Sequence, residues 1–131
     1  MGKFFKMKKI LLKSENIIVE AELNNSRTAE KIWELLPIEG SVNTWGEEIY
    51  FAIGSKIALE EDSSEIVSIG DLAYWPPGEA FCIFFGITPA SYDDEIRAAS
   101  AVNIFGRIIG DTRVFKKVRA GTKIWIEKSN L

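Results

Sequence analysis

The sequence of 131 residues contains no histidine and no glutamine. Histidine is the usual general base near neutral pH and a very common metal ligand. Catalytic triads and metal centres that depend on an imidazole are therefore excluded. Glutamine is a thermolabile amide, and a sequence without it favours a thermophilic source.

Cysteine is nearly absent as well, because Cys82 is the only one in the chain. One cysteine excludes an internal disulfide and any zinc site built from several thiolates. Cys82 lies in an apolar run, where a thiol packs as a small hydrophobic group. We therefore expect Cys82 to be an inert core residue.

Long hydrophobic runs are missing too. The basic N-terminal segment has only the short apolar run Ile10–Leu12 before Lys13, whereas a signal peptide needs about 7–15 apolar residues. No run approaches the roughly 18 residues that a membrane-spanning helix requires. These features predict a cytoplasmic protein that has no membrane partner.

The charge and composition are those of an ordinary soluble domain. The net charge is −3, with 47% hydrophobic and 27% charged residues, and no extended basic face is present to bind nucleic acid. We expect residues 1–7 to form a disordered or extended tail and residues 8–131 to form a single domain. Glycine-rich phosphate loops and metal-ligand spacings are absent, so we predict no cofactor and no metal.

Short strands dominate the pattern of hydrophobic residues. Two runs, 8–12 and 17–23, predict a hairpin, and an amphipathic helix follows and stops at Pro37. A second short helix begins at Asp111. Together with strands at 48–53, 56–59, 66–69, 72–75, 81–85, 101–109 and 123–128, this predicts an all-β fold with two short helices. Either a sandwich or a closed barrel fits such a pattern.

Aromatic residues gather in the stretch Gly70–Gly86. It reads as a strand, a turn forced by Pro76-Pro77-Gly78, and a buried apolar strand. A second aromatic segment places Trp45 near the tip of a loop, and the loop 88–100 is long enough to suggest a function. These aromatic side chains either belong to the core or line a surface groove for a ligand.

The candidate binding residues combine these aromatics with a few polar groups. Glu47 and Glu48 are adjacent on a predicted strand, so their side chains face opposite ways and at most one can line a pocket. Arg97 lies in the long loop, where a guanidinium suits a carboxylate or a peptide carbonyl. We predict no catalytic residue, and the predicted ligand-binding residues are Trp45, Glu47, Tyr50, Tyr74, Trp75, Phe84, Arg97 and Asn103.

Three segments resemble a family of small prokaryotic cyclophilin-like proteins. They are VNTWGEEIYF at 42–51, GDLAYWPPGEA at 70–80 and ASAVNIFG at 99–106. The run Val102–Gly110 also resembles the late strand of cyclophilins, with Ile104 where that strand has valine. The resemblance covers about residues 8–128 and implies a closed eight-stranded cyclophilin-like β-barrel with helices at its ends.

The resemblance does not imply a particular activity. Cyclophilins are prolyl isomerases that use an arginine, a glutamine and a histidine around an aromatic proline pocket, and this chain cannot supply that set. We therefore expect a module that binds a peptide or a small ligand in an aromatic surface groove. A weak or atypical peptidyl-prolyl isomerase is the alternative. A third possibility is an oligomer in which exposed aromatic residues form the subunit interface.

Overall fold

The computed structural model describes residues 7–130, so the tail predicted over residues 1–7 lies, except for Met7, outside the described residues. The predicted hairpin is confirmed as β1 (Lys9–Ser14) and β2 (Ile17–Leu23). The first helix, α1 (Arg27–Leu35), begins where the Ser26 hydroxyl accepts a hydrogen bond from the Ala29 amide at 3.1 Å. It ends as predicted, because Leu36 before Pro37 is extended.

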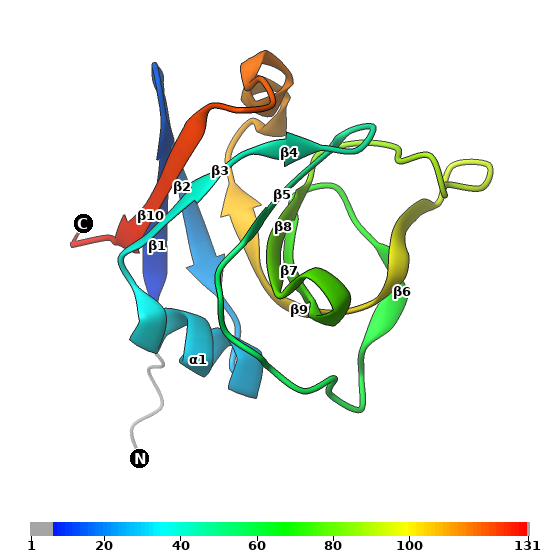
Figure 1. Cartoon of the computed structure of the whole chain (residues 1–131), viewed down its shortest axis with the longest axis horizontal. Coiled ribbons are helices and arrows are strands. Elements are labelled where there is room, and N and C mark those ends of the chain that lie inside the picture. The colour runs from blue at the N-terminus through cyan, green and yellow to red at the C-terminus, as the bar shows by residue number, and fades with distance from the viewer. Residues whose placement is uncertain (1–6, 131) are drawn as a thin grey trace.

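The rest of the described chain is again mostly short strands (Figure 1). The pair Pro76-Pro77 turns the chain through one 3₁₀ turn, as its fixed backbone angles require. A second 3₁₀ helix is capped by the Asp111 carboxylate, which accepts from the Arg113 amide at 2.9 Å. The elements are β3 (Ile38–Ser41), β4 (Asn43–Thr44), β5 (Glu48–Ala52), β6 (Ser64–Val67), β7 (Asp71–Trp75), η1 (Pro76–Gly78), β8 (Ala80–Phe84), β9 (Ile96–Ile109), η2 (Thr112–Lys117) and β10 (Lys123–Lys128).

The sheet is rolled but it is not a closed barrel, so the closed eight-stranded prediction is wrong. In the described residues ten strands form the sheet, in the order β3-β10-β1-β2-β9-β7-β8-β5-β4, with β6 paired to β9. Among residues 7–130, no ladder joins the two end strands, β3 and β4. Only Val42 separates these two strands in the chain. They therefore follow each other along one extended path and do not lie side by side. Val42 itself pairs with the β10 side, through Gly121 and Thr122.

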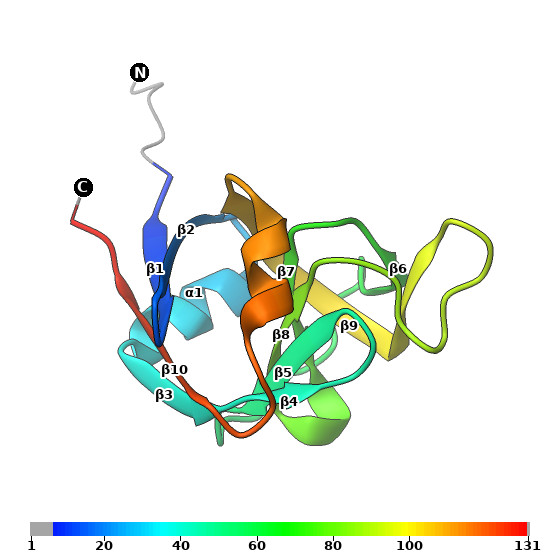
Figure 2. The same ribbon diagram turned by 90° about the horizontal axis from the view of Figure 1, so that it is seen from above.

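The main core fills the inside of the rolled sheet. Inward-facing residues of β1, β2 and β10, such as Ile10, Leu12 and Ile126, are fully buried there. Helices α1 and η2 lie at opposite ends of the roll (Figures 1 and 2), where Ile32 of α1 and Phe115 of η2 are fully buried. None of the helices within residues 7–130 has the length and apolar character needed to cross a membrane.

A second, smaller core lies on the outer side of the sheet, because β9 belongs to two layers. Its C-terminal part pairs with β2 and β7, and its N-terminal part pairs with β6. The pairing with β7 shifts register next to Gly106, where a Cβ atom would lie 2.5 Å from the Glu22 carbonyl oxygen. The predicted close backbone approach at Gly106 is thus confirmed. Between the β6–β9 layer and the sheet lie Val67, Ala73, Ala80, Cys82, Phe84, Ile96, Ala98 and Val102.

The strand predicted at 56–59 does not form. Side chains form the hydrogen bonds to the backbone of this segment that a neighbouring strand would form in a sheet. The Tyr74 hydroxyl donates to the Ser55 carbonyl at 2.6 Å and accepts from the Ile57 amide at 3.1 Å. Asn103 donates to the Ala58 carbonyl at 2.9 Å and accepts from the Glu60 amide at 2.8 Å. The loop predicted at 88–100 is shorter than expected, because β9 already begins at Ile96.

Candidate functional site

A pocket of about 190 Å³ opens at the edge of the second core. An apolar cavity of about 150 Å³ is enough to hold benzene, so this pocket accepts a group the size of one side chain. Strands β5 and β7 and the first half of β9 contribute to it, together with the turn between β4 and β5. Its lining residues are Trp45, Glu48, Tyr50, Trp75, Ala98, Ala99 and Val102.

The tight turn between β4 and β5 places Trp45 at the pocket. The backbone amides and carbonyls of Trp45 and Glu48 bond to each other at 3.0 and 3.2 Å. Gly46 has a positive φ of 59°, and a Cβ there would lie 2.9 Å from the Ile87 carbonyl oxygen. Glycine therefore lets the turn press against the segment that follows β8, which fixes Trp45 beside the pocket.

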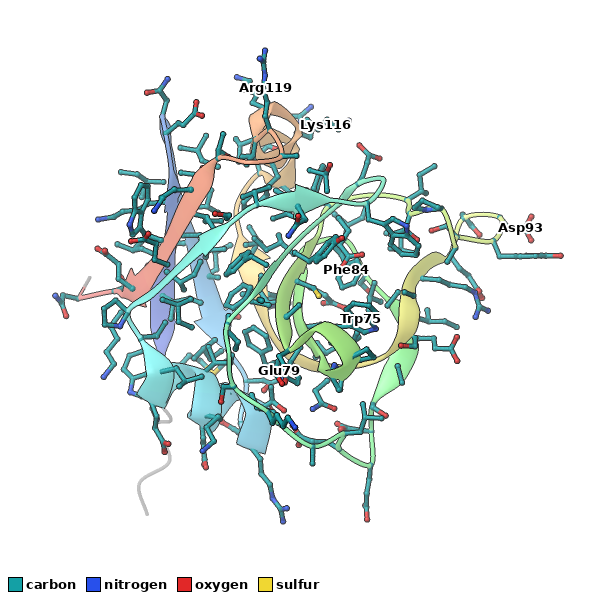
Figure 3. The ribbon with its side chains drawn as sticks, viewed as in Figure 1. Trp75, Glu79, Phe84, Asp93, Lys116 and Arg119 are labelled. Carbon is teal, nitrogen blue, oxygen red and sulfur yellow. The ribbon has the colours of Figure 1, made fainter. Side chains whose placement is uncertain are left out.

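Two aromatic rings, one from β5 and one from β7, line the pocket together. Tyr50 and Trp75 meet edge to face, with ring centroids 6.5 Å apart and planes inclined by 75°. The Trp75 indole nitrogen donates to the Ser100 hydroxyl at 2.7 Å, which ties β7 to β9. Figure 3 shows Trp75 and Phe84 in the space between β8 and the β6–β9 layer.

The polar group of the pocket is the carboxyl of Glu48. Its side chain shares a face of β5 with Tyr50, because side chains alternate along a strand, and the residue is only 6% exposed. Burial raises the pKa of Glu48 to about 7, while hydrogen bonding with the Cys82 thiol acts in the opposite direction. Burial likewise holds the pKa of the Cys82 thiol well above its usual value. Near neutral pH, therefore, Glu48 can exist in both its protonated and its ionised form.

Three of the eight sequence-predicted residues line the pocket together: Trp45, Tyr50 and Trp75. Glu47 points elsewhere. Its carboxylate lies against Gly86 and reaches Lys116 of η2 at 3.7 Å, outside the pocket lining. The side chains of Glu47 and Glu48 thus point to opposite faces of the sheet, as predicted for neighbours on a strand. Only Glu48 lines the pocket.

The other four predicted residues serve different parts of the fold. Tyr74 is fully buried in the main core and holds the segment after β5, as Asn103 does from β9. Phe84 is fully buried in the second core, where it is the cross-strand partner of Glu48. Arg97 pairs with Glu95 at 2.9 Å at the end of the long loop. None of these four belongs to the lining residues of the pocket.

Glu48 and the β9 residues Ala98, Ala99 and Val102 are the lining residues that sequence reasoning missed. A signal for Glu48 was present, since the period of two places it on the same face as Tyr50. The small residues of β9 carried no such signal, because they line the pocket only after β9 has folded over the sheet. Their lack of bulk is what leaves the space open.

The chemistry available at this site is that of one carboxyl group among aromatic rings. Within residues 7–130, no three histidine, cysteine or acidic side chains come together as a metal ion would need. Glu48 can accept a hydrogen bond when ionised and donate one when protonated. The site can therefore recognise a cation or a carbonyl oxygen, depending on the state of one proton.

Comparisons with known proteins agree with the fold and with the resemblance. The solution structure of the hypothetical protein AF2241 from Archaeoglobus fulgidus is similar, with 39% identity and a TM-score of 0.80 over 98% of this chain and all of that one. The comparison with curated proteins found no match. The family model described as cyclophilin-like matches residues 8–127. The chain therefore belongs to the cyclophilin-like family.

Proposed function

We propose that this protein is a binding module, and that its pocket takes one side chain of a peptide or one small organic group. The observation that carries the proposal is the juxtaposition of Trp45, Tyr50 and Trp75 around a cavity of about 190 Å³. Ligand sites are concave, mostly apolar and equipped with a few polar groups, and this pocket has that composition. Drug-sized ligands need about 300 Å³ or more, so the pocket suits a smaller group.

The position of the pocket also supports a peptide as ligand. It lies where the β4–β5 turn, the end of β7 and the start of β9 approach one another, so its mouth is bordered by three chain segments. A peptide crossing this mouth can insert one side chain and keep the rest outside. The aromatic rings then supply most of the buried contact area.

Prolyl isomerisation is the less supported alternative. The usual arginine, glutamine and histidine cannot be assembled from this sequence, and among the described residues lining the pocket none is an arginine. Rotation about a prolyl bond has to overcome a barrier of about 18–20 kcal/mol. The donors available in the pocket lining are the Trp45 indole, the Tyr50 hydroxyl and the protonated Glu48 carboxyl, because the Trp75 indole already donates to Ser100.

Nuclear magnetic resonance of the ¹⁵N-labelled protein tests the binding proposal. Capped single amino acids and short peptides should shift the indole N–H signals of Trp45 and Trp75, but not those of Trp33 and Trp125, which lie outside the pocket. Ala99→Phe fills the pocket mouth and should abolish the shifts. Ala120→Phe adds the same bulk at an exposed site away from the pocket and should leave them unchanged.

The same samples test the alternative in a proline-peptide isomerisation assay. Our proposal expects no acceleration above background with either variant or with the unmodified chain. Acceleration that Ala99→Phe removes and Ala120→Phe preserves would favour the isomerase instead. Ligands that shift no signal of the pocket would contradict the binding proposal.

A further inference from the structure

We propose that the pocket selects a cationic group, an alkylammonium, with the Glu48 carboxylate as its counter-ion and the aromatic rings of Trp45, Tyr50 and Trp75 as its walls. This inference rests on the proposed binding function and specifies its ligand. An alkylammonium comes either from a free amine or from a lysine side chain, and both offer the same chemistry.

Glu48 lacks a positive partner inside the pocket. Among the described residues that line it, none is basic. Beside the carboxyl lies the Cys82 thiol, whose raised pKa keeps it neutral at physiological pH. A buried carboxylate is costly unless it is paired, so a cation from outside would stabilise its ionised form.

Glu48 carries the carboxyl group of the pocket, and the other described lining residues have no carboxyl. On β5 the neighbouring lining residue is Tyr50, on β8 the facing residues are Cys82 and Phe84, and on β7 the facing residue is Trp75. The β9 lining is alanine and valine. The adjacent Glu47 is directed to Lys116, on the other side of the strand.

The aromatic walls distinguish an organic cation from other ligands. The face of a tryptophan or tyrosine ring attracts a cation, and the attraction grows when both are desolvated. This chain already uses such contacts elsewhere, since Lys8 and Lys128 lie 5.3 and 4.7 Å from the ring centre of Trp33. A single carboxylate cannot complete the ligand set of a divalent metal, whereas it suffices for an ammonium group.

Ammonium binding is coupled to the proton on Glu48. The cation requires the ionised carboxylate, whereas a neutral ligand with a carbonyl oxygen requires the protonated form. Because an alkylammonium stays charged throughout, its affinity should rise about 30-fold between pH 5.5 and pH 8.5 for a carboxyl with a pKa of about 7. For a neutral ligand that accepts a hydrogen bond from the protonated Glu48 carboxyl, the affinity should fall over the same interval.

The test measures the affinity of n-butylammonium and of n-butanol, which has the same number of heavy atoms, from the shifts of the Trp45 and Trp75 indole signals. At pH 8.5 the ammonium should bind more tightly, and Glu48→Gln should weaken it on the order of tenfold or more. Glu47→Gln removes the neighbouring carboxylate outside the pocket and should leave the affinity unchanged. Nα-acetyl-lysine methylamide is the third probe, which distinguishes a peptide source from a free amine.

Tighter binding of the lysine derivative than of n-butylammonium would identify a lysine side chain as the source. Weaker binding of the lysine derivative would identify a free amine, and both results support the inference. Equal affinities of n-butylammonium and n-butanol, or binding that Glu48→Gln leaves intact, would overturn the cation preference while the binding function stands. If none of the three probes shifts a pocket signal, the cation preference fails, and the capped amino acids and peptides then decide whether the binding function fails with it.

Discussion

Glu47 and Glu48 are neighbours in the chain, yet they lie in different surroundings. Glu47 is half-exposed and meets Lys116, whereas Glu48 is buried against Cys82 and Phe84. The difference follows from strand geometry, because adjacent side chains point to opposite faces. Burial then sets the chemistry of Glu48 by raising its pKa to about 7.

This raised pKa makes folding depend on pH. The pKa of Glu48 is about 7 in the folded chain and about 4.5 in the unfolded one, so between these values the folded state holds a proton that the unfolded state releases. The contribution of Glu48 to stability is therefore present below about pH 4.5 and is lost as the pH rises to about 7. Glu48→Gln, which is neutral throughout, should match the unmodified protein near pH 4.5 and exceed its free energy of unfolding by roughly 1–3 kcal/mol at pH 8.

Urea unfolding at both pH values measures this difference. The matched control is Glu47→Gln, which should show no such gain between pH 4.5 and pH 8. A Glu48→Gln difference that stays constant with pH would mean that the Glu48 carboxyl has the same pKa in the folded and unfolded chain.

Among the elements, the segment between β5 and β6 is unusual because side chains of other elements hold it. Asn103 of β9 bonds to Thr28, Ala58 and Glu60, and so joins α1, this segment and β9. Thr28 in turn donates its amide proton to the Glu60 carboxylate at 3.0 Å. The Asn103 amide and the Tyr74 hydroxyl thereby replace the strand ladder that the sequence pattern predicts.

Asn103→Ala should therefore lower the free energy of unfolding by about 1–3 kcal/mol, because buried donors and acceptors lose their partner. The Glu60 amide should exchange with solvent faster in this variant, as measured by hydrogen exchange. Ligand binding should persist, since Asn103 does not line the pocket. Asn25→Ala, at an exposed site before α1, should cost less than about 0.5 kcal/mol. An unchanged exchange rate at Glu60 in Asn103→Ala would contradict this role.

For the whole molecule, the two cores share the strands that separate them. Phe81 and Ile83 of β8 face the main core, while Cys82 and Phe84 of the same strand face the second core. The β6–β9 layer therefore packs against a surface that exists only while the rolled sheet is intact. We expect both cores to unfold together.

Cys82 reports on that cooperativity, because it is fully buried in the second core and its thiol has a raised pKa. The native protein should resist thiol reagents, and in urea the onset of labelling should coincide with the loss of the far-ultraviolet circular dichroism signal. Labelling at urea concentrations well below that transition would show that the β6–β9 layer opens on its own.

Sequence reasoning predicted the parts of this fold that depend on local patterns. The β1–β2 hairpin, the end of α1 before Pro37 and the buried strand around Phe84 follow from alternation, capping and proline geometry. The open ends of the sheet were not predictable, because whether β3 and β4 pair depends on the path of the whole chain.

For the pocket, the aromatic residues were evident from the sequence, but their division between core and surface was not. Tyr74 and Trp75 are adjacent and equally aromatic, yet they face opposite sides of β7. Only the fold of β9 over the sheet decides which of them borders a cavity. The packing of β9 over the sheet also buries Glu48, and no local sequence pattern predicts that burial.

The most direct test of the account is a ¹³C nuclear magnetic resonance titration of the Glu48 side-chain carboxyl, first alone and then with n-butylammonium. The account predicts a pKa of about 7 in the free protein, which the bound cation lowers toward the ordinary value. A carboxyl that titrates near 4.5 without ligand, or one whose pKa the cation does not change, would contradict it.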